Sequence, residues 1–424
     1  MNFKDFSVPK VSGRIFYQYA YYPWPVKRKQ FKAAIAFYNR GLKKDPKNAA
    51  FHRCKGWFYH RDGNYSMARA CYSKAIKLAP KDPLGYMWRG YLNAEMSHPK
   101  KAFTDYNKGI ECAPESAMLY SFRGQAYRDI ENIPSALKDF AKAIELDPTF
   151  ISTYGERGWV HFFNKDYAAA IADFNSILKY SPRNVEALAG LSCAYSESGL
   201  HAKALESINR AIELMPTSAE LYNHRGWLNS DRFPTKAGMD FKKAVGLDPN
   251  NSCILNNYAL MLKSKATAIK LLTKAISDDH HEVGFFINRA YLYLETGEIN
   301  KAIEDYSRAI TLKGGALAYS GRAVAKAMLG KCEAALADFN AAFKDVELED
   351  YLLCNRGLVH ATKGNYATAI VDYTAAIGVN PNCASAYKQR GAVYFDKGKY
   401  RLAKIDAAKA HELGKAKAGA PVWD

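Results

Sequence analysis

Twelve alanines recur along the 424-residue chain at a nearly constant spacing. They are Ala34, Ala68, Ala102, Ala136, Ala170, Ala204, Ala237, Ala268, Ala302, Ala335, Ala369 and Ala403. Each of the eleven intervals between them measures 31 to 34 residues. A period in this range indicates one supersecondary unit stacked many times. The architecture is therefore constrained before any functional motif is considered.

Other positions recur in register with these alanines. A small residue, most often glycine, lies twelve residues earlier, and a proline commonly closes the unit. The fourth residue after the alanine is usually bulky and apolar, as in Tyr72, Tyr106, Phe140, Phe174, Ile208, Phe241, Tyr306, Phe339 and Tyr373. Offsets of three, four and seven place such residues on one face of an amphipathic helix, and proline ends a helix. Each unit is therefore predicted to be a pair of helices.

This pattern resembles the tetratricopeptide repeat, a 34-residue helix-turn-helix, from Ala49 to about Leu413. The resemblance implies an all-α fold, a right-handed α-solenoid of stacked antiparallel helix pairs. We expect a basic, aromatic-rich cap with an incomplete repeat at 1–48, eleven repeats in one continuous solenoid at 49–417, and a tail at 418–424. For function the resemblance specifies little, because repeat folds have many roles.

Two predicted repeats are shorter than the others. The unit at 219–251 lacks one residue near Phe233–Pro234, and the unit at 252–282 lacks three. We expect the second shortening in the turn between the helices, around Ser264–Thr267. A hinge, a notch for a partner and simple divergence of the repeat are alternative interpretations.

Arginine and aspartate occur together within the repeats. Eight units carry arginine just before the small residue and aspartate three residues after the alanine, as in Arg89 and Asp105. The units with Lys55, Leu191 or Tyr258 at the first position also lack the aspartate. This co-occurrence predicts ion pairs between the two helices of a unit, since a guanidinium can bind a carboxylate with two hydrogen bonds.

Both ends of the predicted array are basic. The chain has a net charge of +18, of which residues 1–48 contribute +9 and residues 384–424 contribute +5. Residues 14–25 are dense in aromatics, and the basic patch Lys27, Arg28, Lys29 and Lys32 follows them. A cap on the first repeat explains this composition. Contacts with nucleic acid, an anionic membrane or an acidic protein are the alternatives.

The sequence lacks signatures of catalysis, metal binding and export. Nucleotide-binding, hydrolase and metalloprotease motifs are absent. The eight cysteines are scattered without a C-x-x-C pair, which favours reduced thiols over disulfides or a zinc site. Neither a signal peptide nor an apolar run long enough for a transmembrane helix is present. We therefore expect a cytoplasmic protein that is not an enzyme and uses no cofactor or metal.

The candidate binding residues lie on the first helix of each pair, which lines a concave groove in tetratricopeptide proteins. Large aromatics with a polar edge are favoured anchors at protein interfaces. The position after the small residue carries Trp57, Tyr91, Trp159, Trp227 and Tyr291. Polar residues predicted on the same face are Arg53, Arg61, Gln125, Arg128, Asn223 and Asn256. Packing of the rings on adjacent repeats is the alternative interpretation.

The two-carboxylate clamp of chaperone-tail-binding members is not recognisable. Asn257, Asn288 and Asn355 occupy the place of its middle asparagine, but the preceding units lack the required lysine and asparagine. We predict a scaffold or adaptor that binds segments or helices of partner proteins in its groove. The alternative is a repeat protein that associates with RNA, other nucleic acid or anionic membrane through its basic ends. Self-association through the repeat ends is also open.

Overall fold

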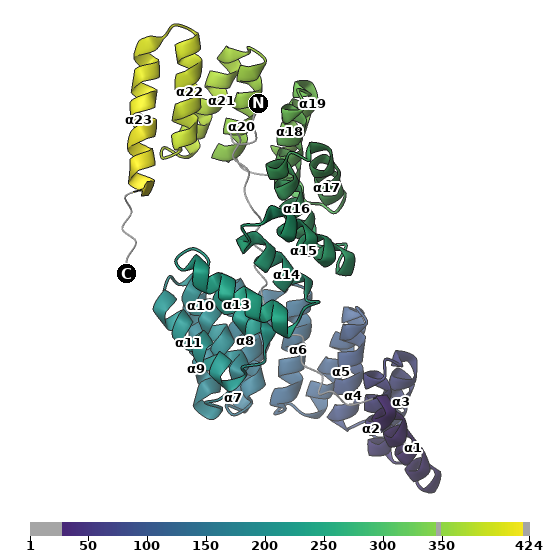
Figure 1. The fold of residues 1–424 in the computed structure, drawn as a ribbon. Coiled ribbons are helices and arrows are strands. Elements are labelled where there is room, and N and C mark those ends of the chain that lie inside the picture. The colour runs from purple at the N-terminus through teal and green to yellow at the C-terminus, as the bar shows by residue number, and fades with distance from the viewer. Residues whose placement is uncertain (1–27, 345–348, 419–424) are drawn as a thin grey trace. The chain divides into compact units, whose positions relative to one another are not determined.

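The computed structural model describes residues 28–344 and 349–418. These described residues form helices and no strand, which confirms the predicted all-α fold. The chain divides into two compact units, one comprising Tyr17–Pro216 and the other including Thr217–Asp424. Helices α1 to α11 belong to the first unit and α12 to α23 to the second (Figure 1).

The helices of the first unit are α1 (Arg28–Lys44), α2 (Ala49–Arg61), α3 (Tyr65–Leu78), α4 (Pro83–Glu95), α5 (Pro99–Cys112), α6 (Ala117–Asp129), α7 (Ile133–Leu146), α8 (Ile151–Phe163), α9 (Tyr167–Tyr180), α10 (Val185–Glu197) and α11 (His201–Leu214). Those of the second unit are α12 (Ala219–Asn229), α13 (Pro234–Leu247), α14 (Ser252–Met261), α15 (Lys265–Asp278), α16 (Val283–Thr296), α17 (Ile299–Thr311), α18 (Gly315–Met328), α19 (Cys332–Ala342), α20 (Asp350–Thr362), α21 (Tyr366–Val379), α22 (Ala384–Asp396) and α23 (Tyr400–Ala418). From α2 onward, each even-numbered helix is the first helix of a repeat and the next odd-numbered helix is its second.

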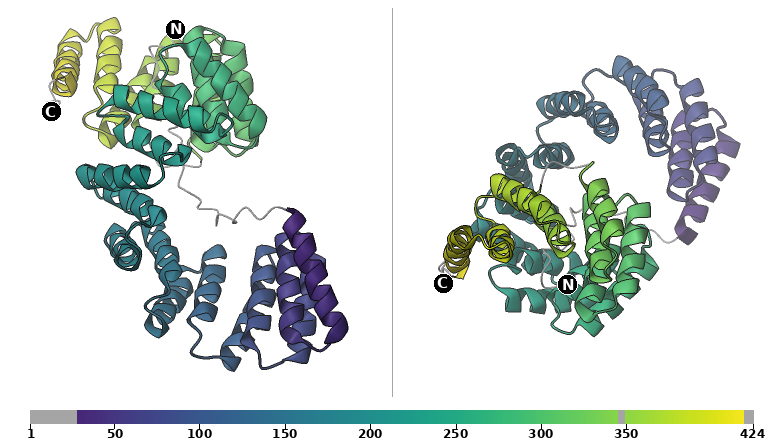
Figure 2. Two further views of the ribbon diagram at one scale, coloured as in Figure 1. Left: turned by 60° about the horizontal axis from the view of Figure 1, so that its bottom comes forward. Right: turned by 90° about the horizontal axis from the view of Figure 1, so that it is seen from above.

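Within each unit the two helices of a repeat pack side by side, and each repeat stacks on the next (Figure 2). Side-chain caps begin many of the helices. Asn48, for example, accepts a hydrogen bond from the backbone N–H of Phe51 at the start of α2, and Asp82 accepts one from Leu84 at the start of α4. Such caps satisfy N–H groups that have no partner inside the helix.

The core lies between the helices, where the periodic residues meet. The recurring alanines from Ala68 to Ala369 are completely buried. The periodic glycines allow the bulky side chains of the second helices to approach closely. A Cβ atom added at Gly90 would lie 2.9 Å from the ring of Tyr106, and one at Gly124 would lie 2.8 Å from the ring of Phe140. Any larger residue at these glycines would displace a buried ring.

All eight predicted ion pairs between arginine and aspartate are confirmed. In each pair the arginine Nε and Nη2 donate to the two carboxylate oxygens over 2.6 to 3.0 Å. Nη1 of Arg89, Arg123, Arg289, Arg322 and Arg390 also donates to the second helix of the preceding repeat, where the acceptors are Ser73, Asn107, Thr273, Ser307 and Thr374. One side chain therefore connects both helices of its repeat with the repeat before it.

The predicted position of the three-residue shortening was wrong. In the shortened repeat at 252–282, the first helix α14 has 10 residues, whereas the equivalent helix α2 has 13. Three residues, 262–264, still separate α14 from α15, as three residues separate α2 from α3. Ser264 accepts a hydrogen bond from the N–H of Thr267 and so caps α15. Because the chain reversal and the cap are retained, the missing residues come from the end of α14.

Candidate protein-binding surfaces

The five predicted groove aromatics lie on first helices, and all five are half-buried. Trp57, Tyr91 and Trp159 belong to the first compact unit, on α2, α4 and α8. Trp227 and Tyr291 belong to the second, on α12 and α16. Each unit therefore presents its own set of partly accessible rings.

Trp159 joins the core to an exposed ring. Its ring centroid lies 5.2 Å from that of Phe174 and 5.5 Å from that of Phe162, and both of these phenylalanines are buried. On its other side Phe163 lies 6.1 Å away and is 56% exposed. The motif analysis missed Phe163, although a residue four positions after Trp159 shares its helix face. Together the two rings form an apolar surface anchored in the core.

Tyr91 packs on both neighbouring repeats. Its ring centroid lies 5.4 Å from that of Phe122 on α6 and 5.5 Å from that of His60 on α2. His60 Nε2 lies 2.6 Å from Glu95 Oε2, and the hydroxyl of Tyr65 donates to Glu95 Oε1 over 3.1 Å. At this site the ring contributes to packing between repeats as well as to the surface.

Trp57 and Tyr291 each contact a polar residue four positions later. The guanidinium of Arg61 lies 5.9 Å from the Trp57 ring centroid, and Arg61 is exposed. The hydroxyl of Tyr291 donates to Glu295 Oε1 over 3.3 Å. Burial, followed by the adjacent carboxylate, raises the pKa of Tyr291 to about 12. Both rings therefore lie next to a polar side chain, which suits a surface that also binds polar groups.

Two of the predicted polar residues form ion pairs within the chain. Arg53 pairs with Asp82, which caps α4 of the next repeat. Arg128 pairs with Asp129 and with Glu156 on α8. Burial raises the pKa of Glu156. Gln125, which also lies on α6, is half-buried.

A series of buried asparagines crosses three repeats of the second unit. Asn288 donates to Asn256 over 2.8 Å, Asn256 to Asn257 over 3.2 Å, and Asn257 to Asn223 over 3.1 Å. All four side chains are buried, and Asn256 and Asn288 are each 1% exposed. Asn257 and Asn288, which occupy the clamp position, therefore contact other asparagines of the chain. Sequence reasoning placed Asn223 and Asn256 on the groove face but did not find this chain of hydrogen bonds.

The basic N-terminal patch is only partly within the described structure. Lys27 and the aromatic residues 14–25 lie outside the described residues. Arg28 and Lys29 begin α1, and Lys32 is exposed on the same helix. Across the part of the chain that the structure describes, no helix is long and apolar enough to cross a membrane. The same residues contain no group of three or more His, Cys, Asp or Glu side chains that could hold a metal ion.

The fold and its repeated contacts define a protein of stacked helical repeats. Sequence profiles described as tetratricopeptide repeat match residues 49–82, 119–150, 164–228, 283–314 and 354–421. The chain belongs to the tetratricopeptide repeat family.

Curated relatives match parts of the chain. Tetratricopeptide repeat protein 6 from Homo sapiens is 33% identical over 158 residues, which cover 37% of this chain and 30% of the relative. Hsp70-Hsp90 organizing protein 1 from Arabidopsis thaliana is 31% identical over 179 residues, covering 33% of this chain and 31% of the relative. The chain thus spans about a third of the length of these relatives. The family supports a protein-interaction scaffold.

Solved structures share the fold at low sequence identity. The human IFIT1 dimer with m7Gppp-AAAA has a TM-score of 0.50 and 14% identity, covering 90% of this chain and 94% of the other. The APC/C hetero-tetramer Cut9-Hcn1 has a TM-score of 0.49 and 14% identity, covering 91% of each chain. At this identity the likeness to IFIT1 concerns the fold alone.

Proposed function

We propose that this chain is a non-enzymatic scaffold that binds segments or helices of partner proteins on the first-helix faces of its repeats. The observation that carries the proposal is the pair of Trp159 and Phe163, in which a core-anchored ring continues into an exposed one. Burial of one such ring against a partner stabilises a complex by about 2 kcal/mol. Aromatic anchors held in place by packing lose little entropy on binding.

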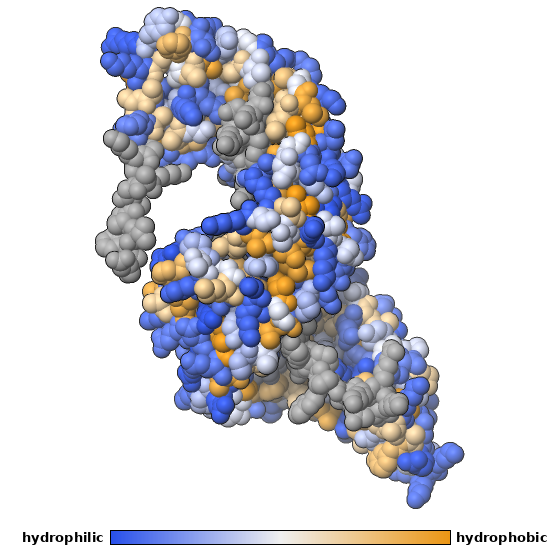
Figure 3. Space-filling view, in the orientation of Figure 1, coloured by the Kyte–Doolittle hydropathy of each residue, from blue (hydrophilic) through white to orange (hydrophobic). Residues whose placement is uncertain are grey.

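The polar residues around these rings give the surface its selectivity. Arg61 lies beside Trp57, and Glu295 accepts a hydrogen bond from Tyr291. A partner that covers these rings must therefore offer groups of either charge at different repeats. The visible face of the molecule carries hydrophobic residues in patches among hydrophilic ones, as Figure 3 shows. Mixed surfaces of this kind are usual at interfaces between separate proteins.

The relatives named Hsp70-Hsp90 organizing proteins suggest one partner class, but the clamp position argues against a chaperone tail. Asn257 and Asn288 are buried in the asparagine series. A ligand carboxylate would have to displace hydrogen bonds between asparagines, and this exchange lowers the net free energy that the carboxylate gains on binding. We therefore favour partner segments that bind through apolar side chains.

The experiment is a recovery of native complexes after mild crosslinking, with parallel samples treated with nuclease and with high salt, followed by mass spectrometry. We expect protein partners to survive both treatments and to be lost on Phe163→Ala in the first unit or Trp227→Ala in the second. Tyr180→Ala is the matched control for the first unit, because Tyr180 is 45% exposed but lies at the end of a second helix, α9.

Circular dichroism of each variant separates lost binding from lost folding. Recovery of nucleic acid, or of partners that disappear with nuclease and salt, would overturn the proposal. That result would assign the function to the basic ends, since affinity for phosphates falls steeply with salt.

A further inference from the structure

The last repeat, α22 and α23, lacks the bulky side chain that fills every preceding repeat. Four residues after the recurring alanine, the second helices α3 to α21 carry large residues that are at most 2% exposed. They are Tyr72, Tyr106, Phe140, Phe174, Ile208, Phe241, Leu272, Tyr306, Phe339 and Tyr373. The equivalent residue of α23 is Ala407, and it is exposed.

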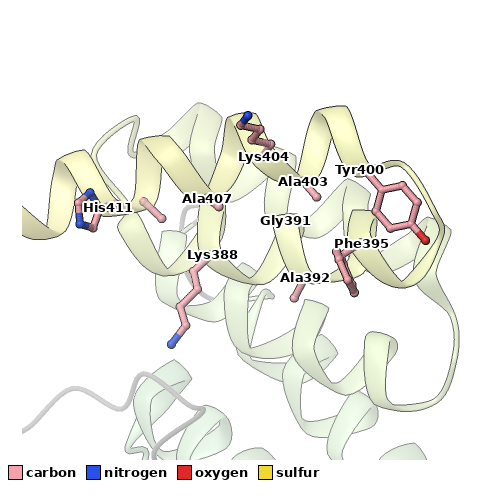
Figure 4. A pocket seen from close by; sticks show the side chains of 10 residues that line it. Lys388, Gly391, Ala392, Phe395, Tyr400, Ala403, Lys404, Ala407 and His411 are labelled. Carbon is pink, nitrogen blue, oxygen red and sulfur yellow. The ribbon is translucent and has the colours of Figure 1, made fainter.

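A hollow of about 670 Å³ occupies the place of the missing side chain. Gly391 and Ala392 of α22 line it from one side, and Ala403 and Ala407 of α23 from the other (Figure 4). At Gly357 in the preceding repeat, an added Cβ would meet the ring of Tyr373 at 2.8 Å. At Gly391 the nearest atom would be Cβ of Asp406 at 3.2 Å, and none of the three nearest atoms belongs to a ring. The two helices are therefore paired as elsewhere, but none of the residues that the structure describes fills the space between their small residues.

Two exposed aromatic side chains also line the hollow. Phe395 is 61% exposed and Tyr400 63%, and their rings lie 5.3 Å apart. Leu402 and Ile405 on α23 are 41% and 56% exposed. The equivalents of Ile405 in repeats that another repeat follows, such as Met239 and Val371, are exposed as well, so Leu402 and Ile405 lie on the outer side of α23. Where α21 has Ile370, Tyr373 and Ile377 in or against the core, α23 has Lys404, Ala407 and His411, so the hollow is apolar at its centre and basic at its rim.

The charges at this end indicate which helix fits. Lys388, Lys404 and His411 are the basic residues of the lining, which contains no acidic residue. Residues 384–424 carry a net charge of +5 and residues 1–48 carry +9. A second copy of this chain would bring one basic end against another, which is unfavourable. An acidic partner is favoured by the same charges.

We propose that the α22–α23 face binds an amphipathic helix of an acidic partner protein, which inserts one large apolar side chain into the hollow between Gly391 and Ala407. Acidic residues beside that side chain face Lys388 and Lys404. The occupant then supplies a large side chain at the place that Tyr373 fills in the preceding repeat. This surface does not include Trp159, Phe163 or Trp227, the residues on which the proposed scaffold function is tested.

The test uses the full chain and a fluorescently labelled, 16-residue helical peptide with glutamates on its polar face and one phenylalanine on its apolar face. Binding is followed by fluorescence anisotropy. We expect binding to weaken at least about tenfold when the peptide phenylalanine is replaced by alanine, or when its glutamates are replaced by lysines.

Ala407→Phe is the decisive variant, because it places in α23 the ring that Tyr373 supplies in α21. We expect it to fold, to raise the melting temperature and to weaken peptide binding at least about tenfold. Lys388→Glu combined with Lys404→Glu should weaken binding without filling the hollow. Lys270→Glu, at an exposed lysine on α15, is the matched control and should bind as the original chain does.

Three outcomes would overturn the proposal. One is equal binding by Ala407→Phe, provided that its circular dichroism is unchanged. If that variant does not fold, equal binding by the double lysine variant decides in the same way. The second is absence of peptide binding to the original chain. The third is binding only after removal of residues 419–424, which would mean that the chain's own tail occupies the face. Phe163→Ala should leave peptide binding unchanged, so failure here is distinguishable from failure of the scaffold proposal.

Discussion

Arg289 on α16 and Asp305 on α17 form a two-point ion pair, in which Nε and Nη2 of the arginine each lie 2.8 Å from a carboxylate oxygen. The arginine side chain is 15% exposed and the aspartate 8%. A third donor, Nη1, reaches the hydroxyl of Thr273 on α15 over 3.0 Å. The guanidinium thus contacts three consecutive helices.

Replacement of Arg289 by alanine should lower the free energy of unfolding of the second unit by about 3 kcal/mol, because Asp305 would stay buried without its counter-charge. Replacing both residues by leucine should cost less than the single change. Urea denaturation, combined with hydrogen exchange of α15 to α17, measures the effect. A loss below about 1 kcal/mol for the single variant would contradict the importance of the pair.

The turn between α8 and α9 contains a strained residue. Lys165 has φ of 64°, a left-handed conformation that glycine adopts without a steric penalty. Lys165→Gly should therefore stabilise the chain by up to about 1 kcal/mol. Gly199, with φ of 77° and open space around it, gives the reverse control, and Gly199→Ala should destabilise by about 1 kcal/mol. Melting curves of the two variants should shift in opposite directions.

His224 on α12 makes stability depend on pH. Burial lowers its pKa from 6.5 to about 4 in the folded chain. The unfolded chain therefore binds the proton first as pH falls. Stability is complete above about pH 6.5 and is lost progressively towards pH 4, by about 3 kcal/mol for this group.

Melting temperatures of the original chain and of His224→Gln, measured between pH 4 and pH 7.5, isolate this contribution from that of the carboxylates. The two curves should converge as the pH falls. Parallel curves would show that His224 is not the titrating group.

Cys383 should be the most readily alkylated of the half-buried thiols. Its Sγ lies 3.9 Å from that of the buried Cys354, and the hydrogen bond from Cys354 lowers the pKa of Cys383 to about 7. Burial raises the pKa of Cys253. Iodoacetamide labelling, followed by mass spectrometry across pH 6 to 9, should show a midpoint near 7 for Cys383. Cys354→Ala should raise that midpoint, and an unchanged midpoint would contradict the assigned cause.

The sequence predicted the contacts that depend on a fixed spacing. The pairing of Arg89 with Asp105 was predicted because arginine and aspartate are present or absent together at these two positions of each repeat. The ion-pair geometry recurs because the two positions keep the same spacing on the paired helices. The asparagine series could not be predicted in this way. Asn256 and Asn257 are neighbours in sequence and occur together in only one repeat, so no period marks their contact.

The candidate binding surface was predicted less completely than the fold. Trp159 was found by its register, but Phe163 was missed because its equivalents in other repeats, such as Arg61 and Glu95, are polar. The division of the chain after Pro216 had no sequence signal either, because Pro216 occupies the same place as the other closing prolines. Features of this kind depend on how individual side chains of neighbouring helices pack, and the repeat spacing in the sequence does not predict them.

The arginine that donates a hydrogen bond to the preceding repeat makes the same kind of contact in successive repeats, so with respect to this contact the repeats are interchangeable. Arg123 finds its acceptor in Asn107, and Arg89 finds the equivalent acceptor in Ser73. If residues 117–150 were removed as a block, Arg157 would face Asn107 in the same register, and no new interface chemistry would be needed. Evolution can therefore add or delete a whole repeat at small cost. This contact therefore places no limit on the number of repeats.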